Sequence, residues 1–237
     1  MTNRTLTYCD LDVIDYKEAW DLQKELFELR HQKKNNDTLL LLEHPHTYTL
    51  GKVAERKNLI GSEGYLKEKN ISVFDIDRGG DITYHGPGQI VGYPIIDLNN
   101  WQKDTHKYLR GLEEVIIRTC NDFSLTAQRV PDYTGVWISD KKVAAIGIKI
   151  SRWITMHGFA FNINTDLSLF SGIIPCGISG KEVTSLHKES GRTIEIQEVK
   201  SKLLKHFMDV FIYTKSININ KDELINPEFT PLFVGAK

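Results

Sequence analysis

The chain has 237 residues, of which 41% are hydrophobic and 26% are charged, and this is the composition of a soluble globular protein that can bury a sizeable core as one domain. Its 30 basic and 31 acidic side chains leave a formal net charge of −1, so no overall positive charge favours nucleic acid or an anionic membrane surface. The N-terminus has no apolar signal segment and no apolar run reaches membrane-spanning length, and we therefore expect a cytoplasmic protein.

The first elements predicted along the chain are a strand and a helix. Residues 6–11 have the character of a strand. From Tyr16 to Leu29, apolar residues recur with a roughly helical period, which predicts an amphipathic helix. Asp15 and Glu18 have the spacing of a capping box, so we expect the helix to begin at Asp15.

The remaining elements are predicted from the same two periods. Helical periodicity predicts two further helices, over residues 108–123 and 199–211. The Pro and Gly of residues 43–51 predict a loop. Apolar and β-branched runs predict strands at residues 38–42, 72–76, 90–98, 135–138, 142–150, 154–164 and 183–186.

The order of these elements predicts the fold class. Consecutive strands with interspersed helices favour an α+β fold, in which helices flank one central mixed β-sheet, over a doubly wound parallel sheet. We expect one domain over residues 1–215. The polar tail at residues 216–237 is expected to be an appendage of the same domain.

Residues 78–93 form the most informative segment of the chain. Glycines at positions 79, 80, 86 and 88 permit positive φ and close approach of another molecule to the backbone, and Pro87 stiffens the turn between them. Ionisable and aromatic side chains share this segment, and strand-like runs flank it. We therefore predict a functional, glycine-rich turn between two strands.

The three cysteines differ in their surroundings. Their odd number and wide spacing fit neither a disulfide framework nor a C-x-x-C pair, and the sequence shows no clustered set of metal ligands. Cys9 in a strand and Cys120 on the apolar stripe of a helix are expected to be small buried hydrophobes. Cys176 lies among the Gly and Pro residues of positions 172–180, where a thiol can be exposed and reactive, so it is the candidate nucleophile.

A nucleophilic thiol needs a base or a cation, because a pKa near 8.5 leaves only about 3% thiolate at pH 7. The candidates are His85, His157 and Lys142. Alternation over residues 141–150 groups Lys142 with larger aliphatic residues, while Lys149 marks the other face as the solvent face. In that setting desolvation would let Lys142 accept a proton. The alternative, that Lys142 only caps the strand at the surface, stays open.

The sequence is similar to the lipoyl (octanoyl) transferase family. Residues 78–93 match every fixed position of the family pattern Arg-Gly-Gly-x-x-Thr-aromatic-His-x-x-Gly-Gln-x-aliphatic-x-Tyr. Segments that resemble other family motifs follow in family order, at Lys142 in Lys-Val-Ala-Ala-Ile-Gly, at residues 157–162, at Cys176 in Ile-Pro-Cys-Gly-Ile and at residues 183–186. With Leu-Glu-His-Pro at residues 42–45, the resemblance covers roughly residues 38–187.

The resemblance implies both a fold and a reaction. The fold would be the α+β architecture of the biotin and lipoyl protein ligases. An octanoyl group would pass from octanoyl-acyl carrier protein to Cys176 as a thioester, with Lys142 as the proton acceptor. It would then pass to the lysine of lipoyl domains in 2-oxoacid dehydrogenase complexes and of the glycine cleavage H protein. Because a thioester already carries the energy for amide formation, no ATP, metal or other cofactor is implied.

The resemblance also implies a set of substrate-binding residues. They are Arg78, Gly79, Gly80, Asp81, Ile82, Thr83, Tyr84, His85, Ala145, Ile146, Gly147, Gly158, Phe159 and Ala160. Small side chains at three of these positions would leave room for the acyl chain. Other roles stay open: Arg78 and Asp81 could form a mutual ion pair, His85 could anchor the loop, and Ile146 and Phe159 could be ordinary core.

Two other functions compete with this interpretation. An ATP-dependent lipoate or biotin ligase would have a similar fold and would also acylate a lysine, but it needs no cysteine nucleophile. A non-catalytic module that binds acylated or lipoylated partners would leave Cys176 without a role.

Overall fold

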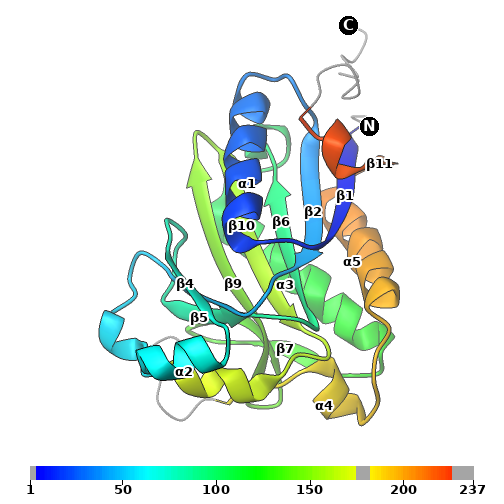
Figure 1. Cartoon of the computed structure of the whole chain (residues 1–237). Helices are drawn as coiled ribbons and strands as arrows, with labels where there is room; N and C mark the ends of the chain where they lie inside the picture. Colours follow the sequence, from blue (N-terminus) through cyan, green and yellow to red (C-terminus); the bar gives the residue numbers. More distant parts are fainter. Residues whose placement is uncertain (1–3, 175–181, 226–237) are drawn as a thin grey trace, which may run out of the picture.

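The computed structural model describes residues 4–174 and 182–225, which form a large mixed sheet with helices on both faces (Figure 1). This sheet has eight strands in the described part of the chain, in the order β11-β1-β2-β6-β10-β9-β8-β7. β1 runs parallel to both β11 and β2, and the other neighbouring pairs are antiparallel. In sheet order the bounds are Lys215–Asn218, Thr5–Val13, Asp37–Glu43, Gln89–Ile95, Ile154–Asn162, Lys141–Ser151, Tyr133–Ile138 and Ala127–Val130.

Helix α1 (Tyr16–His31) covers one face of the large sheet, and α3 (Thr105–Asp122) and α5 (Ile196–Phe211) cover the other (Figure 1). The leucines of β2 show why both faces are covered. Leu40 and Leu42 pack in the cluster that contains the apolar side of α1, whereas Leu39 and Leu41 pack in the cluster of α3 and α5. A strand buried on both faces explains why the sequence of β2 is a continuous apolar run.

A second, smaller sheet lies beside the large one (Figure 1). Its order is β4-β3-β5, with bounds Ser72–Asp75, Thr47–Leu50 and Ile82–His85, and β3 is parallel to β4 and antiparallel to β5. Together with α2 (Glu63–Glu68) it buries a core of its own around Tyr48, Ile82 and Tyr84. Within the glycine-rich segment, strand β5 of the small sheet is followed directly by strand β6 of the large sheet. The segment therefore joins the two sheets.

Short helical segments complete the described chain. α4 spans Leu186–Ser190, and 3₁₀ turns span Arg56–Asn58, Leu98–Asn100, Leu167–Gly172 and Lys221–Glu223. No helix among the described residues combines the length and apolar character that crossing a membrane requires.

A buried cluster around Asp37 joins four distant parts of the chain. Its carboxylate accepts hydrogen bonds from Arg30 Nε at 2.7 Å, Arg4 Nη2 at 3.0 Å and the Tyr213 hydroxyl at 2.8 Å. The backbone N–H of Asp97 is a further donor at 2.9 Å. Because Asp37 is only 5% exposed, these contacts neutralise a carboxylate that would otherwise be costly to bury.

The α+β class with a mixed central sheet, the three predicted helices and most of the predicted strands are confirmed. The helix begins directly after Asp15, but the capping box is wrong, because the Asp15 side chain makes no capping hydrogen bond. The predicted loop at residues 43–51 contains strand β3, whose four residues are all buried.

Two further predictions need correction, and one stays untested. The glycine-rich segment is not a simple turn, because β5 forms within it and pairs with β3. Residues 183–186 make only one bridge, between Val183 and Lys142, before α4 begins. The domain limits at residue 216 stay a prediction; β11 extends across that position and pairs with β1.

Candidate active site

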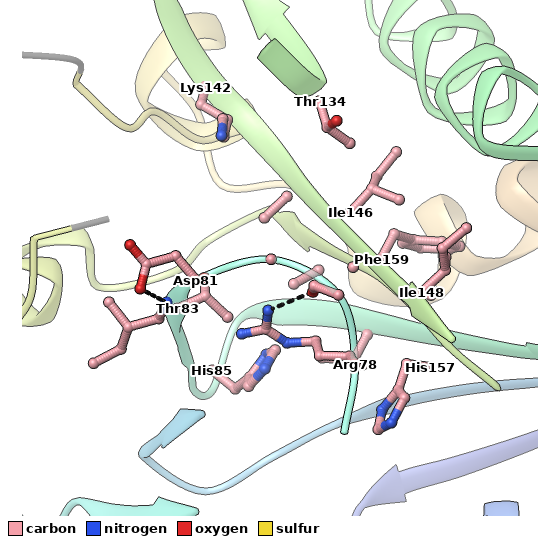
Figure 2. Close-up of a pocket in the computed structure, with 18 of the residues that line it drawn as sticks. Arg78, Asp81, Thr83, His85, Thr134, Lys142, Ile146, Ile148, His157 and Phe159 are labelled. Atoms are coloured by element: carbon pink, nitrogen blue, oxygen red, sulfur yellow. Dashed lines mark hydrogen bonds between the residues drawn. The ribbon is translucent and has the colours of Figure 1, made fainter. Parts of the chain in front are cut away.

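A pocket of about 410 Å³ lies where the small sheet meets strands β9 and β10. Figure 2 shows Arg78, Asp81 and His85 gathered on one side of it and Ile146 and Phe159 on another. Three segments that are far apart in the sequence therefore meet here. Lys142 lines this pocket together with Arg78, Gly79, Gly80, Asp81, Ile82, Thr83, His85, Ala145, Ile146, Gly147, Gly158, Phe159 and Ala160.

Tyr84 is the predicted binding residue that does not line the pocket. Its side chain is fully buried in the core of the small sheet, where the hydroxyl lies 2.8 Å from His46 Nδ1 and the ring packs edge-on against Tyr48. Successive side chains of a strand point to opposite faces, which explains why Tyr84 turns away while its neighbours Thr83 and His85 reach the pocket.

The glycine-rich loop is fastened across strand β9. The N–H of Gly79 donates to the carbonyl oxygen of Ile148 at 2.9 Å, and the Arg78 carbonyl accepts from Lys52 N at 3.0 Å. Gly80 has φ +91°, a conformation that favours glycine. A Cβ atom at Gly147 would lie 2.8 Å from Arg78 Cδ, so glycine there lets the loop approach the strand closely.

Arg78 and Asp81 have separate hydrogen-bond partners. Arg78 is 8% exposed, and its Nη2 donates to both the carbonyl and the hydroxyl oxygen of Thr49, each at 3.0 Å. Asp81 accepts from Asn58 Nδ2 at 2.8 Å and from the N–H of Ile82 at 2.7 Å. The guanidinium therefore braces the loop against β3, and the carboxylate braces it against the 3₁₀ turn at Arg56–Asn58.

His85 is held by both of its ring nitrogens. Nδ1 lies 2.9 Å from Gln89 Oε1 and Nε2 lies 3.3 Å from Thr49 Oγ1. Burial lowers the pKa of His85 well below its usual value, and the nearby His44 adds to that effect. A neutral ring with both nitrogens engaged acts as an anchor for β5.

His157 and Lys149 both contact Asp77 beside the pocket. His157 Nε2 lies 2.9 Å from Asp77 Oδ1, and Lys149 Nζ forms an ion pair with Asp77 Oδ2 at 2.5 Å. Burial lowers the pKa of His157, and its hydrogen bond holds the pKa of Asp77 well below the usual range. The prediction that Lys149 marks a solvent face is wrong, because the Arg78 loop covers that face at Gly147.

Lys142 is fixed through its backbone and reaches the pocket with its side chain. Its N–H donates to the Glu182 carbonyl and its carbonyl accepts from Thr184 N–H, both at 2.9 Å. Nζ lies 4.9 Å from the centre of the Trp137 ring, within the range of a cation–π contact. Lys142 also lines the pocket, and its chemical role there stays a prediction.

Cys176 lies outside the described residues, but the chain on either side of it is attached next to the pocket. Before it, Ile174 N–H donates to the Asn58 carbonyl at 2.8 Å, and the Asn58 side chain bonds to Asp81. After it, Glu182 bonds to Lys142. The other cysteines are buried, as predicted, and burial raises the pKa of each thiol to about 12.

Sequence reasoning did not single out several residues of the pocket wall. Gln89 and Asn162 are 1% and 4% exposed, and they hydrogen-bond to each other at 2.9 Å. An amide directly after the apolar run Phe159–Phe161 was the available signal for Asn162. The other such residues are Tyr16, Val53, Val91, Tyr93, Leu109, Asp132, Tyr133, Thr134, Ile148, Phe170 and Val183.

Comparisons with known proteins point to one group. Residues 15–208 match the family model described as the lipoyl protein ligase A/B catalytic domain. The chain is 49% identical to a protein of Christiangramia forsetii named octanoyltransferase, over 88% of this chain and 97% of the other. It is 52% identical to one of the same name from Rubrobacter xylanophilus, over 82% and 88% of the two chains.

The fold is also that of a solved structure. A putative lipoate protein ligase from T. acidophilum with bound lipoic acid aligns with a TM-score of 0.72, over 95% of this chain and 93% of that one. Its sequence identity is 16%, so this likeness concerns the fold alone.

Proposed function

The chain belongs to the octanoyltransferases of the lipoyl protein ligase A/B catalytic-domain family, and on this premise we propose that octanoyl-acyl carrier protein is its donor and Cys176 its nucleophile. The Cys176 thiolate attacks the donor thioester, and the carrier thiol leaves with a proton. The ε-amine of a lysine on a lipoyl domain then attacks the enzyme thioester. An amide forms, and the Cys176 thiol is regenerated.

Lys142 serves as the proton acceptor in this proposal. It takes the proton of Cys176 in the first step and a proton of the attacking amine in the second. The observation that carries the proposal is the meeting of Lys142 with the Arg78 loop in one pocket, since the chain on both sides of Cys176 is attached there.

The pocket supplies the site for the octanoyl chain. Its volume of about 410 Å³ lies within the range of small-molecule sites, and Ile146, Ile148 and Phe159 give it apolar walls. Each buried methylene contributes about 0.8 kcal/mol, or roughly fourfold in binding. Binding should therefore weaken with each methylene that is missing from the acyl chain. The predicted binding residues of the three segments contact the acyl group, and Tyr84 supports the wall from behind.

The partners follow from the reaction. The acceptors are the lipoyl domains of 2-oxoacid dehydrogenase complexes and the glycine cleavage H protein, and the protein acts in the cytoplasm, where its donor is made. The reaction uses neither ATP nor a bound cofactor, since the donor is already a thioester.

The test is transfer to an unmodified lipoyl domain, followed by the mass of that domain. With octanoyl-acyl carrier protein and no ATP, the acceptor lysine should gain one octanoyl group. Modification only by free octanoate with ATP would instead identify an ATP-dependent ligase. Binding of the lipoyl domain without modification under either condition would identify a binding module.

A further inference from the structure

A continuous chain of hydrogen bonds runs through the wall of the pocket, from the Arg78 loop to the backbone of Lys142. Its side-chain members are all buried, with exposures of 8% or less. The first half of the chain joins Arg78 Nη2 to Thr49 Oγ1 at 3.0 Å, Thr49 Oγ1 to His85 Nε2 at 3.3 Å, and His85 Nδ1 to Gln89 Oε1 at 2.9 Å. The second half joins Gln89 Nε2 to Asn162 Oδ1, Asn162 Nδ2 to the Thr184 carbonyl, and Thr184 N to the Lys142 carbonyl, each at 2.9 Å.

The donors and acceptors in this chain are mutually consistent. Gln89 uses Nε2 to donate to Asn162 and to the Tyr84 carbonyl, so its Oε1 is the acceptor and His85 Nδ1 is the donor. In a neutral His85 ring the other nitrogen, Nε2, has no proton and must be an acceptor, so the Thr49 hydroxyl donates to it. Thr49 in turn receives the Arg78 N–H. Each member thus fixes the orientation of the next.

Asn162 is the link between the two halves of this chain. Its oxygen accepts from Gln89 on β6, and its nitrogen donates to the carbonyl of Thr184, just beyond the Lys142 clamp formed by the Glu182 carbonyl and the Thr184 N–H. An apolar residue would fill this place in a strand core more cheaply. The amide is therefore best explained by the segment that it holds.

We propose that Asn162 is a positioning residue, which holds residues 182–184 and through them fixes Lys142 relative to the Arg78 loop. The inference rests on the proposed function, because it assigns Asn162 to the placement of the proton acceptor. A displacement of about 1 Å in a reacting group can cost on the order of a hundredfold in rate. Losing the Asn162 bond to Thr184 releases one side of the Lys142 clamp.

Asn164 is a matched control two residues along the chain. Its nitrogen donates to the Ile194 carbonyl at 2.7 Å and its oxygen accepts from the Ile194 N–H at 3.0 Å. Asn162→Asp and Asn164→Asp therefore each turn one donated bond to a carbonyl into a contact between two oxygens. They differ in the segment that is released, since Ile194 does not bond to Lys142.

The experiment has two readouts on the full-length protein. One is the rate of octanoyl-thioester formation on Cys176 in a single turnover. The other is the pH midpoint for labelling of Lys142 by acetic anhydride, read by peptide mass. Asn162→Asp should slow the thioester about tenfold to a hundredfold and move the Lys142 midpoint, while Asn164→Asp stays within about threefold of wild type with the midpoint unmoved. The neutral, similarly sized variant Asn162→Leu should form the thioester equally slowly, which would show that the lost hydrogen bond and not the new charge slows the reaction. It also replaces Asn162→Asp if that variant does not fold.

The possible results separate the two proposals. Wild-type rates in both Asn162 variants, equal slowing in the Asn164 variant, or slowing without movement of the Lys142 midpoint would each overturn the positioning role and leave the proposed function standing. A folded wild-type protein that forms no thioester on Cys176 would overturn the proposed function itself. In that case the Lys142 midpoint still decides whether Asn162 positions Lys142.

Discussion

Gly147 lies directly against Arg78, because a Cβ atom at position 147 would be only 2.8 Å from Arg78 Cδ and 2.9 Å from the Gly79 carbonyl oxygen. The loop of the small sheet therefore rests on bare backbone of the large sheet. The hydrogen bond from Gly79 N–H to the Ile148 carbonyl fixes this contact. The shape of the pocket beside this contact therefore depends on the absence of a side chain at Gly147.

Gly147→Ala should lift the loop from β9. The new methyl group would lie within 3 Å of Arg78 Cδ and the Gly79 carbonyl oxygen, and overpacking of this kind costs about 1–3 kcal/mol of unfolding free energy. We expect octanoyl transfer to fall at least about tenfold as the pocket deforms. The control is Gly64→Ala in α2, where a Cβ would lie 3.8 Å from Ser62 Oγ, an ordinary contact distance. Equal transfer rates in the two variants would contradict this role of Gly147.

Lys142→Ala should slow formation of the Cys176 thioester about a hundredfold or more, because it removes the proton acceptor. Lys142→Arg should be nearly as slow, since a guanidinium keeps the charge but does not release its proton near neutral pH. The measurement is single-turnover acylation followed by intact mass. Lys141→Ala, at the neighbouring position that does not line the pocket, is the control and should react like wild type.

Asp37→Asn should destabilise the whole fold without acting on the pocket. It leaves Arg4 and Arg30 without their buried carboxylate, and breaking such a pair typically costs about 3–5 kcal/mol. Urea unfolding would show a lower midpoint with the slope preserved. Asp21→Asn breaks the exposed contacts with Lys17 and Lys24, and it should leave the midpoint nearly unchanged. A similar loss in both variants would contradict the importance of burial here.

The free energy of unfolding should fall as the pH drops from 7 to 5, in part because of His44. Burial lowers the pKa of His44 to about 4, against about 6.5 in an unfolded chain. Between these values the unfolded state binds a proton that the native state does not, so stability is present above pH 6.5 and is lost towards pH 4. This residue alone accounts for about 2 kcal/mol between pH 7 and pH 5.

His44→Gln is the variant that checks this pH dependence. It should lose about 2 kcal/mol less than wild type between pH 7 and pH 5, whatever its stability at pH 7. Urea unfolding at the two pH values gives the comparison. Identical losses in the two proteins would show that His44 is not the titrating group.

The sequence predicted those parts of the fold that depend on local patterns. Four consecutive leucines at residues 39–42, bounded by polar residues, are typical of a short strand covered on both faces, and the periodic apolar residues of α3 and α5 are typical of amphipathic helices. β11 escaped prediction because it is a short edge strand with mostly exposed side chains, and only its pairing with β1 makes it a strand. β3 escaped because four residues between Pro45 and Gly51 look like a loop until the small sheet buries them.

In the candidate site, too, local features could be predicted and contacts between distant residues could not. The glycine-rich segment could be predicted, since its glycines, charges and aromatic residues are adjacent in the sequence. The cover over Lys149 could not be predicted, because it comes from a loop some seventy residues earlier in the chain. The partnership of Gln89 with Asn162 is equally non-local.

The most direct test of the account is the intact mass of the purified protein after incubation with octanoyl-acyl carrier protein, with Cys176→Ser measured in parallel. We predict one octanoyl adduct on the wild-type protein, labile to hydroxylamine as a thioester should be, and none of that kind on Cys176→Ser. A folded wild-type protein without an adduct, or an adduct that persists in Cys176→Ser, would contradict transfer through Cys176.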